Sequence, residues 1–437
     1  MTSRLRYTFA VVLCFHGLTT HSVHGQSPDQ WIEQHLPELT QAYIWFHQNP
    51  EVSFAEKETA AKFSMYLKEA GYDVTTDVGG HGVVGLMRNG DGPTVMLRTD
   101  LDALPVKEQT ALPFASKKTV EAAGGITTGI MHACGHDVHI TNVIGTAQYL
   151  ASHRDQWHGT LMVIGQPAEE RGAGAQAMLD DGLFERFAKP DYAVALHVGS
   201  DIAAGTVTVA GGFMLANVDS VDITLKGRGG HGSAPQTTVD PIAMAALLIV
   251  DLQTIVSREI AATSPAVVTV GSIHAGSKHN IIPDECHLQL TIRSYDDQTR
   301  ETLLASIQRK ANAISTSFRA EKPEIKIGEG TPALENDDEL AGRLAKAFAE
   351  AIGTENVLPS EPSMGGEDFS RYGRAGVPIL MYRLGAVSQE RLDRFKQLGV
   401  SPPSLHSATF YPDIDRALPV AMKTMIAAVL ELCQLTK

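Results

Sequence analysis

The sequence has few cysteines, an excess of acidic over basic residues and, beyond its N-terminal segment, no long uncharged apolar run. Its 437 residues include four cysteines, and Cys134, Cys286 and Cys433 lie far apart, so a disulfide framework is not expected. The net charge of −14 argues against nucleic acid or an anionic membrane as a partner. No later segment reaches the roughly 18 uncharged apolar residues of a spanning helix, so we expect no membrane anchor.

The N-terminal segment has the pattern of an export signal. Arg4 and Arg6 precede an apolar core at 7–15, and small residues follow at 22–25, which is typical of a signal peptide over residues 1–25. Its removal would leave 34 basic against 50 acidic residues, a net charge of −16. We therefore expect an exported protein, periplasmic or secreted.

The length and the 43% hydrophobic content favour two domains with sizeable cores. Alternation of helical and strand patterns is typical of an α/β fold with a largely parallel sheet flanked by helices. Helices are expected at 56–70, 138–150, 241–258, 298–318, 339–351 and 413–435, and strands at 83–87, 94–98, 160–164, 192–196, 218–225, 266–273, 286–293, near 325 and at 379–382.

Within this pattern, residues 213–329 form a separate unit. Their order of strands and helices is β-α-β-β-α-β, that of a split βαβ sandwich. The sequence thus predicts one domain built from 26–212 and 330–437, interrupted by an inserted domain at 213–329.

A cluster of metal-ligand residue types occupies positions 131–139, which contain Cys134, three histidines and one aspartate. Cys134 and His136 are candidate ligands of a divalent metal. Asp100 and Asp102 end a preceding strand and could orient a ligating imidazole. Taken alone, a Cys-x-His pair is equally compatible with a polar turn.

Three further sites follow predicted strands or precede the last helix. Glu169 and Glu170 alone would read as a solvated helix start, and His197 and His406 as capping or loop histidines. In open α/β sheets, ligands bind at the carboxyl ends of the strands. Because several of these residues are expected at that edge, together they indicate a binding site more strongly than any one of them does alone. The ligand types suffice for two metals that share a bridging group: Cys134, His136, Glu170, His197 and His406. Glu169 is then free to move a proton.

The glycine-rich segment 227–235 contains His231. It is a poor phosphate loop because no Lys-Ser/Thr pair follows. It could present His231 to a reaction centre or be a tight turn with an incidental histidine. Asn280 and Arg293 are suited to gripping a carboxylate or carbonyl.

The motifs occur in an order that resembles a known family. They are Arg98-Thr99-Asp100-Leu101-Asp102-Ala103-Leu104-Pro105 and the segments 131–139, 166–170, 229–235, 280–284, 364–369 and 405–406. The chain resembles the metal-dependent aminoacylase and carboxypeptidase amidohydrolases over nearly its whole length after residue 25. It is most similar to the branch that contains hippurate hydrolases and indole-acetyl-amino-acid hydrolases.

The resemblance implies that Cys134 bridges two divalent ions and that Glu169 is the general base. It further implies a homodimer formed through the inserted domain, in which His231 reaches the oxyanion in the partner subunit. Asn280 and Arg293 match positions that contact the substrate carboxylate. Arg171 and the pair Gly199-Ser200 depart from the family pattern beside the pocket.

The leading hypothesis is hydrolysis of the amide bond of N-acyl amino acids. Zinc or manganese is the expected metal, and cobalt or nickel would also suit these ligands. The alternatives are an exported dipeptidase or carboxypeptidase of the same fold and a non-catalytic protein that binds acyl-amino acids or metal. In a further alternative Cys134 acts as a nucleophile with a histidine base.

Overall fold

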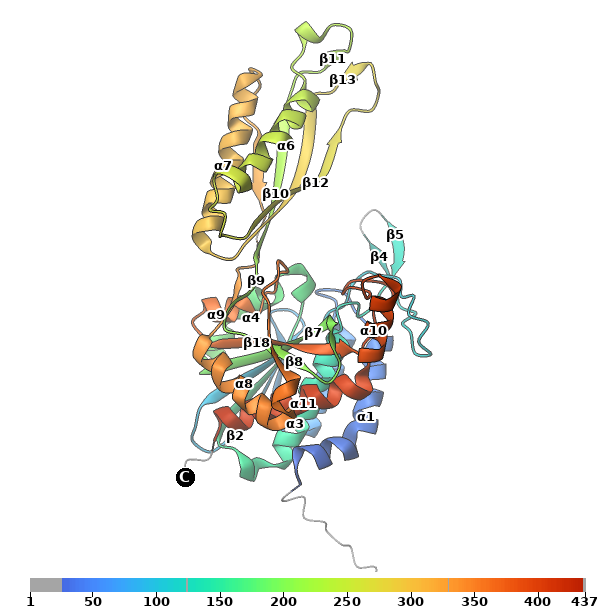
Figure 1. The fold of residues 1–437 in the computed structure, drawn as a ribbon, viewed down its shortest axis with the longest axis vertical. Coiled ribbons are helices and arrows are strands. Elements are labelled where there is room, and N and C mark those ends of the chain that lie inside the picture. The colour runs from blue at the N-terminus through green and yellow to red at the C-terminus, as the bar shows by residue number, and fades with distance from the viewer. Residues whose placement is uncertain (1–25, 123–124, 329, 435–437) are drawn as a thin grey trace, which may run out of the picture.

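The computed structural model describes residues 26–122, 125–328 and 330–434. The expected signal peptide at 1–25 lies outside these residues, as do the last position of the helix expected at 413–435 and residue 329 of the inserted domain. The described chain forms two bodies, a large α/β body and a smaller elongated one that projects from it (Figure 1).

The large body is built around an eight-stranded sheet with the order β1-β2-β6-β3-β7-β18-β8-β17. Its centre is parallel: β3 (Thr94–Asp100) pairs with β6 (Gly159–Gln166) and β7 (Tyr192–Ala203), and β7 pairs with β18 (Ile379–Val387). β2 (Gly82–Asn89) runs antiparallel to β6. The expected fold class, a mixed and largely parallel sheet flanked by helices, is confirmed.

Helices cover both faces of this sheet. The larger core includes apolar residues of α1 (Pro28–Gln48), α2 (Lys57–Glu69), α3 (His136–Ser152), α8 (Asp338–Ile352) and α11 (Ile414–Leu432). The opposite face packs against three short helices, α4 (Gly174–Asp180), α5 (Leu183–Arg186) and α9 (Ser370–Arg374). The strands are buried on both faces, which is why they read as continuous apolar runs in the sequence.

The smaller body is an antiparallel sheet with the order β12-β14-β10-β15. It follows the expected β-α-β-β-α-β sequence: β10 (Asn217–Lys226), α6 (Pro241–Arg258), β12 (Ala266–Ala275), β14 (Glu285–Ser294), α7 (Asp297–Ser317) and β15 (Glu324–Ile327). It has a core of its own beneath α6 and α7. The exact domain bounds and the dimerisation role remain predictions.

The remaining elements are short or peripheral. They are β1 (Asp73–Val78), β4 (Thr119–Ala122), β5 (Ile126–Gly129), β8 (Val207–Val209), β9 (Gly212–Leu215), β11 (Gly230–His231), β13 (Ile281–Ile282), β16 (Leu334–Asn336), β17 (Val357–Pro359), α10 (Gln389–Leu398) and the short 3-10 helices η1 (Arg154–Gln156), η2 (Glu169–Arg171), η3 (Pro235–Thr237) and η4 (Thr354–Asn356).

Helix α6 leaves part of its apolar surface exposed. It is the one helix of the described chain long and apolar enough to cross a membrane, with a mean hydropathy of 1.4. One such helix is weak grounds for a membrane span, because the core helix of a soluble protein passes the same test. Met244 and Leu248 pack on the sheet, whereas Leu247 and Val250 are 53% and 68% exposed. α6 therefore leaves an apolar face exposed in the single chain.

Arg98 ties the central strands to the chain after residue 360. Its buried guanidinium donates to Asp100 at 2.8 Å, to Glu367 at 2.8 Å and to Asp368 at 3.1 Å. Its Nε donates to Gln166 at 3.0 Å. One cation thus sits among three buried carboxylates at the carboxyl end of β3.

Replacing Arg98 with Met should lower the free energy of unfolding by about 3 to 5 kcal/mol, because it leaves buried carboxylates without their cation. Chemical denaturation measures the change. As a control, Arg416→Met breaks an ion pair with Glu390 whose two side chains are 55% and 69% exposed, and it should leave the free energy of unfolding nearly unchanged. Equal small losses for both variants would contradict this account.

Candidate metal centre

The candidate site lies where the central parallel strands end. β3 ends at Asp100, β6 at Gln166 just before Glu169, and His197 lies within β7. Cys134 precedes α3, and His136 is the first residue of that helix. Gly135 between them has a φ of 79°, and a Cβ there would lie 2.5 Å from the Val198 side chain. The turn that aims Cys134 and His136 at β7 therefore requires glycine.

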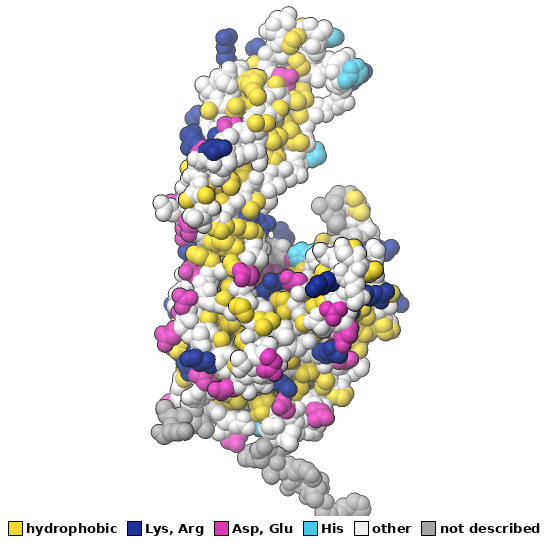
Figure 2. Space-filling model, in the orientation of Figure 1, with side chains coloured by type: hydrophobic (Ala, Val, Ile, Leu, Met, Phe, Trp, Pro, Cys, Tyr) yellow, Lys and Arg dark blue, Asp and Glu magenta, His cyan; other side chains and the backbone are white. Residues whose placement is uncertain are grey.

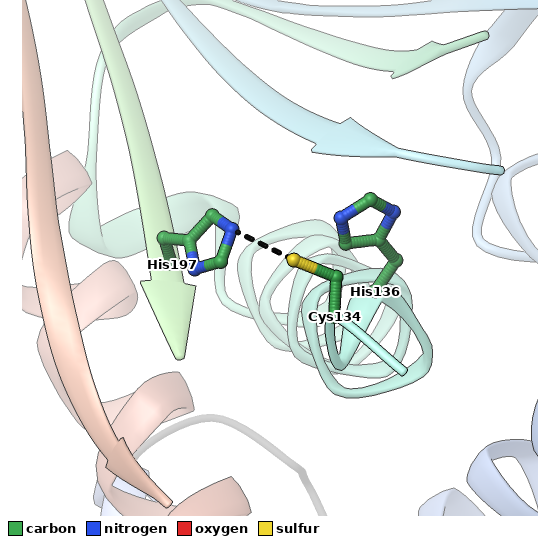
Figure 3. A group of neighbouring side chains, drawn as sticks. All are labelled: Cys134, His136 and His197. Carbon is green, nitrogen blue, oxygen red and sulfur yellow. Dashed lines mark hydrogen bonds between the residues drawn. The ribbon is translucent and has the colours of Figure 1, made fainter. Parts of the chain in front are cut away.

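Two ligand groups share the Cys134 sulfur. In the first, Sγ lies 3.5 Å from His197 Nε2 (Figure 3), with His136 alongside. In the second, Sγ lies 3.3 Å from His406 Nε2, which is 3.5 Å from Glu170 Oε2. The structure thus brings together all five predicted ligands, although the chain separates Cys134 from His406 by 272 positions.

The ring nitrogens are oriented for metal binding. His136 Nδ1 donates to the Asp102 main-chain carbonyl at 2.8 Å, and His197 Nδ1 donates to the Val198 carbonyl at 2.8 Å. In its neutral form each ring would therefore present an unprotonated Nε2 to the centre. His136 Nε2 and Glu170 Oε1 are buried without a hydrogen-bond partner among the described residues. These two atoms lie 3.8 Å apart and belong one to each of the two Cys134 groups, so cations bound to the two groups would satisfy both.

The pKa shifts of the site also favour bound cations. Burial and the nearby Glu170 carboxylate raise the pKa of the Cys134 thiol well above its ordinary value. Burial likewise raises the pKa of Glu170 to about 7. Thiolate and carboxylate would be held together in a buried site by bound cations, which favour the deprotonated ligands.

Asp100 and Asp102 support the site in a different way from the expected one. Asp102 orients His136 through its main-chain carbonyl, while its carboxylate accepts from Ser53 Oγ at 2.6 Å and from the main-chain N–H of Glu170 at 3.0 Å. The Asp100 carboxylate accepts from His139 Nδ1 at 2.8 Å. Asp102 therefore fixes a ligand-bearing loop, and Asp100 fixes a histidine outside the five-ligand set.

Glu169 lies beside the ligands without belonging to either Cys134 group. Its Oε2 is 3.8 Å from His136 Nε2, and the residue is 8% exposed. Burial, Glu367 and Glu170 raise the pKa of Glu169 well above its ordinary value. A carboxylate with a raised pKa beside the ligands is suited to accept and return a proton.

Arg293 is the predicted substrate-binding residue that reaches the centre. It lines two cavities that also contain Cys134, His197 and His406. Its guanidinium donates to Thr291 Oγ1 at 3.1 Å and to the Met364 carbonyl at 3.2 Å. Figure 2 shows a hollow between the two bodies with histidine and acidic side chains at its floor.

His231 and Asn280 do not line either cavity. His231 is exposed on β11, which pairs with β13 next to Asn280. This two-stranded ribbon lies at the end of the small body that is remote from the eight-stranded sheet (Figure 1). Within one chain, therefore, the structure does not bring His231 to the candidate ligands.

Sequence reasoning missed three buried residues around the site. His139 donates to Asp100 and accepts from the Val198 N–H at 3.0 Å. Glu367 and Asp368 contact Arg98 and lie near Glu169. The only sequence signal for the pair was its place in the 364–369 motif.

A family model described as peptidase family M20/M25/M40 matches residues 96–395. The chain is 41% identical to a hippurate hydrolase of Campylobacter jejuni over 74% of this chain and 82% of the relative. It is 37% identical to an N-acetylcysteine deacetylase of Bacillus subtilis over 75% of this chain and 82% of that protein.

A solved structure supports a centre with two metals. The Bacillus subtilis YxeP protein, described as a dinuclear metal-binding peptidase, is 30% identical, with a TM-score of 0.74 over 92% of this chain and 99% of that chain. Together with the two groups that share Cys134, this likeness indicates that the chain binds two divalent metal ions.

Replacing Glu170 with Ala should reduce the bound metal from two ions per chain to one or none, because the group around His406 loses its carboxylate ligand. Elemental analysis of the purified protein measures the content. Glu38→Ala, on the exposed side of α1, serves as the matched control and should retain both ions. Two ions in the Glu170 variant would show that Glu170 is not a required ligand.

Proposed function

The chain belongs to peptidase family M20/M25/M40, and we propose that this metal-dependent amidohydrolase cleaves the amide bond of N-acyl amino acids. The observation that carries the proposal is Glu169. Its buried carboxylate lies beside the ligand groups and lines a cavity that also contains Arg293. The site thus combines a proton acceptor, a metal centre and a cation for a substrate carboxylate.

In the proposed reaction, bound divalent ions supply Lewis acidity and an activated water at neutral pH. Glu169 accepts the proton of the attacking water and later donates it to the departing amine. Arg293 holds the substrate carboxylate, which fixes the distance from the amino acid to the scissile bond. Ionised Glu169 is needed before attack, and its protonated form is needed for amine release.

Two other interpretations explain fewer features of the site. Binding without catalysis gives no role to Glu169 beside Glu170. A Cys134 nucleophile would need a thiolate, but burial raises the thiol pKa and lowers the pKa values of His197 and His406. Cys134 is better explained as a thiolate held by cations.

A peptidase activity is the second candidate. The chain is 35% identical to thermostable carboxypeptidase 2 of Saccharolobus solfataricus over 84% of this chain and 89% of that protein. A dipeptide carries the same carboxylate and the same type of scissile bond as an N-acyl amino acid. The two candidates differ in whether the acyl side bears a free amino group, so the same substrate panel separates them.

We further propose a homodimer in which His231 acts in the partner subunit. β12 is an edge strand of the small sheet, and α6 exposes Leu247 and Val250. An open edge and an apolar face on one body are suited to pairing with a second copy. His231 could then supply a hydrogen bond to the developing oxyanion of the other site. Export to the periplasm or beyond is proposed from the signal pattern at 1–25.

Glu169→Gln should lower kcat by roughly 10²-fold or more while the metal content stays at two ions, because the amide cannot accept the proton. Amine release from hippurate measures turnover, and elemental analysis measures the metal. Glu38→Gln provides the matched surface control. Near-normal turnover of the Glu169 variant would remove it from the role of base.

Mixed dimers test the proposed position of His231. Dimers of the inactive variants Glu169→Gln and His231→Ala contain one site with both native residues if His231 acts across the interface. Such mixtures should recover up to about half of the activity per hybrid dimer, since catalysis by that site needs both groups. Without any recovery in verified hybrids, His231 does not act in the partner subunit.

A further inference from the structure

Two cavities of contrasting character meet at the candidate metal centre. Both are lined by Cys134, His197, His406 and Arg293. The first, here called the apolar chamber, has a volume of about 380 Å³ and is lined by six apolar side chains: Met214, Leu215, Leu334, Met364, Met381 and Leu405. The second, the polar chamber, has a volume of about 320 Å³ and contains Glu169, Arg171, Ser220 and Glu367.

The position of Glu169 decides which half of a substrate lies in which chamber. Glu169 lines the polar chamber and is absent from the lining of the apolar one. The departing amine must take its proton from Glu169, so the amino-acid half has to lie on that side. Arg171 in the same chamber and Arg293 at the junction suit the carboxylate of this half.

The acyl half of the substrate would then occupy the apolar chamber. Met214, Leu334 and Met381 are at most 5% exposed, so the chamber reaches into the core beneath β9, β16 and β18. Besides Arg293, two charged side chains line it. Arg383 lies 3.5 Å from the Asp201 carboxylate, and Glu361 is exposed. The deep wall is therefore apolar, and thioether side chains adapt readily to flexible alkyl groups.

We infer that the apolar chamber selects substrates with an unbranched aliphatic acyl group of intermediate length over N-acetyl amino acids. The inference rests on the proposed function and makes it more specific. A cavity of this size is at the small end of ligand pockets, so it would hold a short alkyl chain and reject a long one. Methionines at three points of the wall would adjust around the chain as it enters.

The test is a substrate matrix that varies the two halves separately. Along the acyl axis, kcat/KM for acetyl-, butanoyl- and hexanoyl-glycine should rise about four-fold for each added methylene, from roughly 0.8 kcal/mol per buried methylene. Along the amino-acid axis, acetyl-glycine and acetyl-norleucine should differ much less, because that side chain lies outside the apolar chamber.

Two substitutions of Met364 should shift the preferred acyl length in opposite directions. It is half-buried in a loop, and its contact with Arg293 is made by the main-chain carbonyl, which substitution retains. Met364→Phe should lower the hexanoyl-to-acetyl ratio of kcat/KM at least ten-fold by shortening the chamber. Met364→Ala should move the preferred acyl length upward. Met65→Phe, at a half-buried position of α2 that lines neither chamber, should leave the ratio unchanged.

The outcomes distinguish a failure of this inference from a failure of the proposed function on which it rests. A rise along the acyl axis, with opposite shifts for the two Met364 variants, supports the inference. Measurable hydrolysis with a flat acyl axis, or Met364 variants that alter the amino-acid axis instead, overturns the inference and leaves the amidohydrolase proposal standing. Hydrolysis of no acyl-amino acid in the matrix overturns both.

Discussion

The structure depends on holding several acidic groups together out of water. Four acidic groups lie around the candidate site, and none is more than half exposed: Cys134, Glu169, Glu170 and Glu367. Burial and the nearby Asp368 raise the pKa of Glu367 to about 8. The guanidinium of Arg98, which contacts Glu367, supplies one compensating positive charge. Burying acidic groups at this density is costly unless cations compensate them. Bound divalent ions supply that compensation, so the buried acidic groups favour metal binding at this site.

Parallel strands turn this electrostatic arrangement into a reaction site. β3 and β6 end at one edge of the sheet and β7 runs past it, so Asp100, Glu169 and His197 lie there although they are distant in the chain. Helix α3 brings His136 from the same edge, and the loop before α11 brings His406. The small body contributes Arg293 from β14. Substrate carboxylate and metal centre are therefore supported by different bodies, and their relative position matters to binding.

Much of this could be predicted because the strongest signals are local. Buried parallel strands are continuous apolar runs, so β3, β6 and the first half of β7 were placed well, as was the order of elements in the small body. Helix α10, whose described residues include no buried position, and the β4–β5 hairpin had no comparable apolar pattern. The roles of His139 and Glu367 depend on partners 39 and 269 positions away, which spacing does not reveal. The ligand set could be predicted because Cys134 and His136 lie in one dense cluster of ligand residue types, and Glu170 and His197 follow apolar runs.

Anomalous diffraction from crystals of the metal-loaded protein tests the central claim most directly. The account predicts two peaks on either side of the Cys134 sulfur, each about 2.3 Å from it if the metal is zinc, with His136 and His197 near one and Glu170 and His406 near the other. A single peak, or peaks that leave the Cys134 sulfur without a metal, would contradict the shared-thiolate centre.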